Sequence, residues 1–125
     1  MKLTILGNPI TKKNHQQIVK IGTRHSLIQS KQYRQYENDC LWQIPGSAKI
    51  LISEPVNVKC IYYMQTRHRV DLVNLLEATN DILVKAGVLD DDNSKIVVSH
   101  DGSRVMWDKN NPRVEIEIKR IISEV

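Results

Sequence analysis

The sequence predicts an α+β fold, in which a mixed β-sheet of about four to five strands packs against two helices. Two patterns support this class. Short segments alternate apolar with polar residues, as strands do, and two longer segments repeat apolar residues at spacings of three and four, as helices do. With 125 residues, of which 41% are hydrophobic, the chain can bury a core as a single domain over residues 1–125. We expect both helices to lie on one face of the sheet.

Strands are expected wherever the alternating pattern occurs. Gly22 is a natural turn residue between two of these segments, which we therefore interpret as a hairpin. The clearest strand covers residues 56–64, where apolar Val56, Val58, Cys60 and Tyr62 alternate with other residues. The predicted strands, in order, are 2–7, 16–21, 25–29, 56–64, 94–99, 104–107 and 113–120.

The two helices begin and end at typical capping residues. Ser30 can cap a helix that runs to Trp42, shortly before Pro45. Asp71 can cap a second helix, and Gly87 suits the position just after its C-terminus. The apolar stripe of this second helix comprises Leu72, Leu75, Leu76, Thr79, Ile82, Leu83 and Ala86.

Composition and motifs argue against several classes of protein. No apolar run approaches the roughly 18 residues needed to cross a bilayer, and the N-terminal apolar run is too short for a signal peptide. Cys40 and Cys60 are too few for a disulfide framework, so we expect reduced core residues in a cytoplasmic protein. No Gly-rich phosphate loop follows a strand, so no nucleotide cofactor is expected. The four histidines lack the spacing of zinc ligands.

The distribution of charge indicates a polyanionic partner. The net charge is +4, yet residues 1–70 contain 11 Lys and Arg against 3 Asp and Glu, whereas residues 71–125 contain 7 against 11. A basic half beside an acidic half is typical of a protein that holds nucleic acid against a metal site. An uneven but functionally neutral surface stays open as the alternative.

The region around the second helix carries the strongest chemical signal. Arg67, His68 and Arg69 precede Asp71, and three further carboxylates, Asp90–Asp92, follow the helix. Carboxylate oxygens are the ligands that Mg²⁺ prefers. A helix of roughly 16 residues separates its ends by about 24 Å, so the acidic loop would have to fold back to meet Asp71. A solvated acidic loop is therefore the competing interpretation.

This ordered set of residues resembles the RusA family of Holliday-junction resolvases, small dimeric endonucleases common in phages and prophages. The family pattern has basic residues, then Asp-Leu-Asp-Asn-Leu with a Lys shortly after, an amphipathic helix, Gly and an Asp pair. The matching residues here are Arg67, Arg69, Asp71, Leu72, Asn74, Leu75, Asp81, Gly87, Asp91 and Asp92. The opening strand, the loop containing Lys12 and Lys13 and the start of the first helix also fit, so the resemblance covers nearly the whole chain.

The resemblance implies roles for the acidic residues, with two departures. Asp71, Asp91 and Asp92 would be catalytic residues and ligands of Mg²⁺, or of Mn²⁺ in its place, and the acidic loop would lie near the helix start. Val73 stands where the family has its second Asp, and Glu77 stands where it has Lys. Glu77 becomes a candidate catalytic carboxylate on the same helix.

The implied substrate is a four-way DNA junction, cut by a homodimer in the cytoplasm of a bacterium, with a phage or prophage origin. We expect phosphate contacts from a set of polar and basic side chains: Lys12, Lys13, Asn14, Arg24, Arg67 and Arg69. Two alternatives stay open. The first is a junction-binding protein that has lost nuclease activity through the changes at Val73 and Glu77. The second is a small-molecule or protein-interaction domain with a solvated acidic loop.

Overall fold

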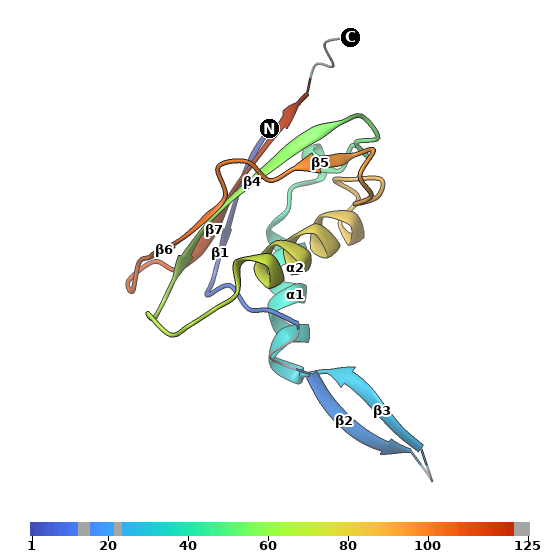
Figure 1. Cartoon of the computed structure of the whole chain (residues 1–125), viewed down its shortest axis with the longest axis vertical. Helices are drawn as coiled ribbons and strands as arrows, with labels where there is room; N and C mark the ends of the chain where they lie inside the picture. Colours follow the sequence, from blue (N-terminus) through green and yellow to red (C-terminus); the bar gives the residue numbers. More distant parts are fainter. Residues whose placement is uncertain (13–15, 22–23, 122–125) are drawn as a thin grey trace.

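The computed structural model describes residues 1–12, 16–21 and 24–121, with backbone alone for 16–21 and 24–29. Figure 1 shows the resulting arrangement of strands and helices. The elements in this part of the chain, in order, are β1 (Lys2–Leu6), β2 (Gln16–Ile21), β3 (Arg24–Gln29), α1 (Lys31–Gln43), the short 3-10 helix η2 (Gly46–Ala48), β4 (Val56–Met64), α2 (Leu72–Lys85), β5 (Val97–Ser99), β6 (Arg104–Trp107) and β7 (Arg113–Arg120).

The main sheet has five strands and is mixed, as predicted. Its order is β1-β7-β4-β5, and β6 pairs with β4 beyond the end of β5. Strand β7 runs antiparallel to both β1 and β4, whereas β5 and β6 run parallel to β4. The nine-residue strand β4 is therefore the element to which most of the sheet is attached.

One face of the sheet carries the core. Every second residue of β4 is buried, from Val56 to Met64, and the intervening residues are half-buried. Both helices lie on this side in Figure 1, which confirms the expectation of a single covered face. A hydrogen bond of 2.7 Å between the Tyr62 hydroxyl and the Thr79 hydroxyl joins the sheet to α2. The buried residues of α2 are Leu75, Ala78, Thr79, Ile82 and Leu83.

The helix boundaries follow the predicted caps. The Ser30 hydroxyl accepts a hydrogen bond from the Tyr33 N–H at 3.1 Å, and the Asp71 carboxylate caps α2. Gly87 has φ of 79°, a conformation that glycine adopts without the strain that a Cβ causes. The 14 residues of α2 place its two ends about 21 Å apart.

Strand β5 is shorter than its sequence suggested. It was expected to begin at Ser94 but begins at Val97. The N–H groups of Ile96 and Val97 both donate to the Asn93 carbonyl, at 3.0 and 2.9 Å. These bonds hold residues 93–96 in a turn, so the apolar character of Ile96 reflects a buried turn rather than strand pairing.

The predicted hairpin is present as strands β2 and β3, which pair antiparallel with Ile21 opposite Arg24. In Figure 1 the hairpin extends away from the sheet and helices. It joins the main body just before Ser30, where α1 starts. The hairpin therefore forms an arm beside the helical layer.

Two further expectations about the chain can be compared with the structure. Among the described residues, no helix is both long and apolar enough to cross a membrane. Cys40 and Cys60 are buried free thiols, as predicted. Burial raises the pKa of the Cys40 thiol to about 11 and that of the Cys60 thiol to about 12.

Candidate functional site

Asp71 is fixed at the start of α2 by the helix itself. Its carboxylate accepts hydrogen bonds from the Val73 N–H at 2.9 Å and the Asn74 N–H at 3.4 Å. The side chain is exposed, because it lies where the connection from β4 enters the helix. Asp71 thus has a structural role as an N-cap and still presents carboxylate oxygen to solvent.

The acidic loop is fixed at the other end of α2. Leu89 bridges to Ile52, and the Asp90 N–H donates to the Ile52 carbonyl at 2.9 Å. The Asp91 carboxylate accepts from the Asn93 amide at 2.8 Å and the Asp92 N–H at 2.9 Å. These two bonds hold the pKa of Asp91 below its usual value, so the group is fully ionised at neutral pH.

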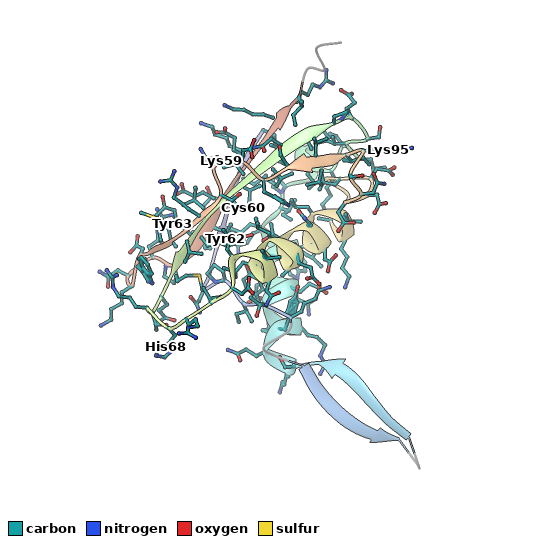
Figure 2. The ribbon with its side chains drawn as sticks, in the orientation of Figure 1. Lys59, Cys60, Tyr62, Tyr63, His68 and Lys95 are labelled. Atoms are coloured by element: carbon teal, nitrogen blue, oxygen red, sulfur yellow. The ribbon has the colours of Figure 1, made fainter. Side chains whose placement is uncertain are left out.

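One chain does not bring the predicted metal ligands together. Figure 2 shows His68, just before α2, and Lys95, just after the acidic loop, at opposite sides of the molecule. No group of three or more His, Cys, Asp or Glu side chains within the described ranges could hold a metal ion. Asp71 and Asp91–Asp92 have the oxygen chemistry that suits Mg²⁺. Their positions in a single chain do not form a metal site.

Charged side chains also occupy the contact between the two helices. Lys85 of α2 lies 2.7 Å from Glu37 of α1, and Lys12 pairs with Asp81 of α2. Burial, followed by the charges of Glu37 and Asp81, raises the pKa of Tyr33 above its ordinary value. Lys12 is therefore held against α2 rather than extended into solvent.

Glu77 is exposed on α2, and its charge also contributes to the raised pKa of Tyr33. Its carboxylate therefore acts electrostatically on the layer between the helices. Asp71, Glu77 and Asp81 together give α2 carboxylates at its start and along its middle.

The basic residues before α2 face two different neighbours. The Arg67 guanidinium carbon lies 4.5 Å from the centre of the Trp107 ring. His68 and Arg69 instead line a cleft of about 210 Å³ between this connection and the N-terminal segment around Pro9. All three basic side chains are exposed, so the connection that leads to Asp71 presents the two arginine charges to solvent.

Three predicted DNA contacts remain: Lys13, Asn14 and Arg24. Lys13 and Asn14 lie outside the described residues. Arg24 is the first residue of β3, and only its backbone is described.

Sequence reasoning did not single out Trp107. It lies in the short strand β6, where it is 46% exposed beside Met106, which is 40% exposed. A lone Trp in a four-residue strand gives no periodic signal, so only the pairing of β6 with β4 reveals that it meets Arg67.

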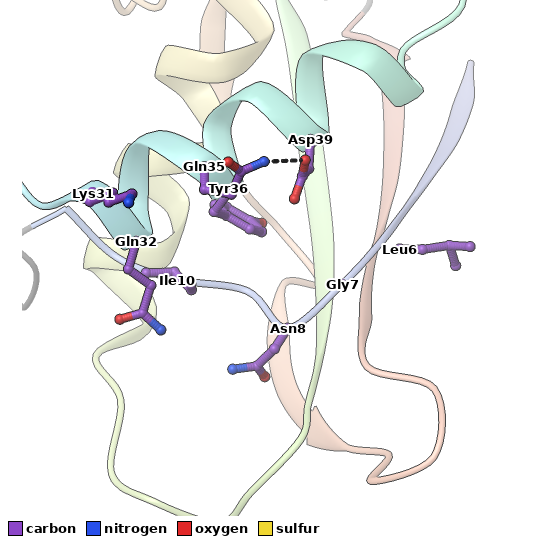
Figure 3. A pocket seen from close by; sticks show the side chains of 9 residues that line it. All are labelled: Leu6, Gly7, Asn8, Ile10, Lys31, Gln32, Gln35, Tyr36 and Asp39. Carbon is purple, nitrogen blue, oxygen red and sulfur yellow. Dashed lines mark hydrogen bonds between the residues drawn. The ribbon is translucent and has the colours of Figure 1, made fainter.

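A larger, mainly apolar groove of about 620 Å³ runs between the end of β1 and α1. Figure 3 shows Asn8 and Ile10 beside Tyr36 of α1, whereas the Leu6 side chain points away from it, and the Gln35 amide donates to Asp39 at 2.9 Å. Among the predicted catalytic and DNA-binding residues whose side chains the structure describes, none lines this groove. We therefore place the candidate site at the entrance to α2 and at the acidic loop.

Comparison with known proteins places these features in one family. The family model for endodeoxyribonuclease RusA matches residues 7–119, nearly the whole chain. The match includes α2, the basic connection before it and the acidic loop after it. A search of curated proteins finds none that matches the chain.

Proposed function

Because the chain belongs to the endodeoxyribonuclease RusA family, we propose that it is a metal-dependent endonuclease that resolves four-way DNA junctions. It would act in the cytoplasm of a bacterium, as a phage or prophage product. The observation that carries this proposal is the placement of Arg67, His68 and Arg69 on the exposed connection that leads directly to the Asp71 carboxylate.

The proposed DNA contacts are mainly to phosphates. Arg67 lies against Trp107 and Arg69 lines the cleft beside Pro9, so we propose that they contact different phosphates near Asp71. Lys12, which is held against α2 by its ion pair with Asp81, is proposed as a further phosphate contact on the N-terminal side. We also propose Lys13, Asn14 and Arg24 as phosphate contacts. Contacts of this kind select the shape of the DNA rather than its base sequence.

We propose Asp71, Asp91 and Asp92 as ligands of Mg²⁺ or Mn²⁺, and these three with Glu77 as the catalytic carboxylates. Since Asp71 and Asp91–Asp92 lie at opposite ends of α2, we propose that each metal site forms between two subunits of a homodimer. A divalent ion held there would polarise the scissile phosphate and lower the pKa of a bound water. Glu77 would supply a carboxylate from the middle of the same helix.

The direct test uses a labelled four-way junction and a linear duplex of the same sequence, each with Mg²⁺ or with EDTA. We expect symmetric nicks in the junction that require Mg²⁺ and disappear in Asp92→Asn. Lys95→Gln, three residues beyond the acidic run, is the control and should nick like the wild type. Equal nicking of the junction and the linear duplex would contradict the proposed substrate.

A second candidate function is junction binding without cleavage. The departures at Val73 and Glu77 favour it, because Val73 removes a carboxylate from the first turn of α2. In that case the protein would bind the junction tightly in EDTA and in Mg²⁺ alike and leave both strands intact. The same junction assay separates the two functions.

A further inference from the structure

Strand β6 places an aromatic side chain beside the proposed site. Its parallel register with β4 sets Val105 beside Tyr62 and Trp107 beside Met64. Tyr62 and Met64 are buried beneath the helical layer, and Val105 packs against the same core. Alternation along β6 therefore directs Trp107 to the side of the sheet on which α2 begins.

Trp107 is exposed but firmly held. Beyond it, the Asp108 N–H donates to the Met64 carbonyl at 2.9 Å, which fixes the end of β6 to the end of β4. The Asp108 carboxylate is in turn bound by Arg113 at 2.9 Å. The backbone that carries the indole is thus pre-ordered, so a ligand that stacks on the ring would lose little entropy in ordering it.

A positive charge lies against the exposed ring. Arg67 lies over it at 4.5 Å, and this arginine is four residues before Asp71 along the exposed connection. The nearest carboxylate in sequence, Asp108, is paired with Arg113, which also pairs with Glu115. Even with Arg67 in contact, 46% of Trp107 remains exposed. An exposed aromatic ring beside a guanidinium suits a ligand that has a flat aromatic group and a negatively charged group.

From this geometry we propose that Trp107, with Arg67 against its ring, forms a stacking platform for an unpaired nucleobase at the branch point of the DNA. Bases stack on Trp and on arginine planes regardless of sequence, and the attached phosphates are attracted by the guanidinium. This inference rests on the proposed junction-resolving function. It adds a reason for the preference for branched DNA, because paired bases inside a linear duplex cannot reach the ring.

The first test compares the affinity of Trp107→Ala with that of Trp42→Ala. Trp42 is the only other Trp in the chain and is 89% exposed on α1, so it is a matched control. Trp107→Ala should bind the junction about 10-fold more weakly, as expected for one lost base stack. Its binding should keep the wild-type dependence on salt, whereas Arg67→Ala should weaken that dependence by about one phosphate contact. Trp107→Phe should retain most of the affinity.

The second test measures the fluorescence of Trp107. In Trp42→Phe, Trp107 is the only source of Trp fluorescence, and we expect quenching by the junction and by single-stranded oligothymidine but little by the linear duplex. If the wild type cleaves junctions yet Trp107→Ala behaves like Trp42→Ala, the stacking platform is refuted and the nuclease function stands. If quenching by oligothymidine occurs without any preference for the junction, the platform stands and the proposed substrate fails.

Discussion

At the scale of single residues, Asp71 combines a structural contact with a proposed catalytic role. Its carboxylate caps α2 through the N–H groups of Val73 and Asn74. Asn is also a good N-cap but is a much weaker metal ligand than a carboxylate, so two substitutions can separate the roles.

We predict that Asp71→Ala lowers the free energy of unfolding by about 1 kcal/mol, because the cap is lost. Asp71→Asn should stay within about 0.5 kcal/mol of the wild type, because an Asn side chain still caps the helix. Both variants should fail to nick the junction in Mg²⁺. Urea unfolding gives the first quantity and the junction assay the second. If Asp71→Asn nicked the junction at the wild-type rate, Asp71 would have only its structural role as the N-cap of α2.

The buried thiols predict how stability changes at alkaline pH. Burial raises the pKa of Cys60 to about 12 from an ordinary value near 9. The unfolded chain therefore loses this proton first, so the stabilising contribution is complete below about pH 9 and is lost as the pH rises toward 12. Cys40, with its pKa raised to about 11, acts in the same direction.

The measurement is urea unfolding between pH 7.5 and 10.5. Each thiol can contribute a slope of up to about 1.4 kcal/mol per pH unit above pH 9. Cys60→Ala should be less stable at pH 7.5, because it leaves a small cavity, but its stability should fall less steeply with pH. A slope in Cys60→Ala as steep as in the wild type would assign the alkaline transition to other groups.

At the scale of elements, helix α2 shows which features sequence patterns can predict. Its caps at Asp71 and Gly87 and its apolar stripe are local properties, and the structure confirms them. The contact of Arg67 with Trp107 depends on β6 pairing with β4, a long-range event with no local signature. The ion pairs Lys12–Asp81 and Lys85–Glu37 depend likewise on how α1 and the N-terminal segment pack against α2.

The position of Val73 in the first turn of α2 lets us predict the effect of restoring the Asp that the family has there. Val73 is 68% exposed, so a polar residue there loses no core packing. Val73→Asp should raise stability by about 0.3–1 kcal/mol, because a carboxylate near a helix N-terminus interacts favourably with the helix dipole. Under the proposed function it should also increase Mg²⁺-dependent nicking.

Val73→Asn is the matched control, with nearly the shape of Asp but no charge. It should gain neither the dipole interaction nor activity. Thermal unfolding and the rate of junction nicking, measured for both variants, give the comparison. Equal nicking rates for the two variants would show that a carboxylate at this position does not contribute to the site.

At the scale of the whole molecule, the fold of a single chain keeps the proposed metal ligands apart. Strand β4 leads through the basic connection into α2, and α2 carries the chain about 21 Å to the acidic loop, which is bound to Ile52. The sequence predicted the basic connection and the acidic loop at the two ends of α2. It did not predict how far apart they lie, because that depends on whether the acidic loop folds back along the helix. Two copies with their α2 helices antiparallel would bring opposite ends together, and each pair of subunits would then hold two equivalent sites.

This arrangement predicts that two inactive variants restore activity when mixed. Asp71→Asn and Asp92→Asn should each be inactive, because both composite sites of each homodimer lack one ligand. In a mixed dimer, one site combines both substitutions, and the other combines wild-type Asp71 from one subunit with wild-type Asp92 from the other. After refolding together, about half of randomly formed dimers are mixed, and each should nick one strand of a junction without the symmetric second nick. The single nick should require Mg²⁺, and a mixture of Asp71→Asn with Asp71→Ala should show none. If the site were complete within one subunit, every dimer in the first mixture would be inactive as well, so the absence of nicking there would contradict shared sites.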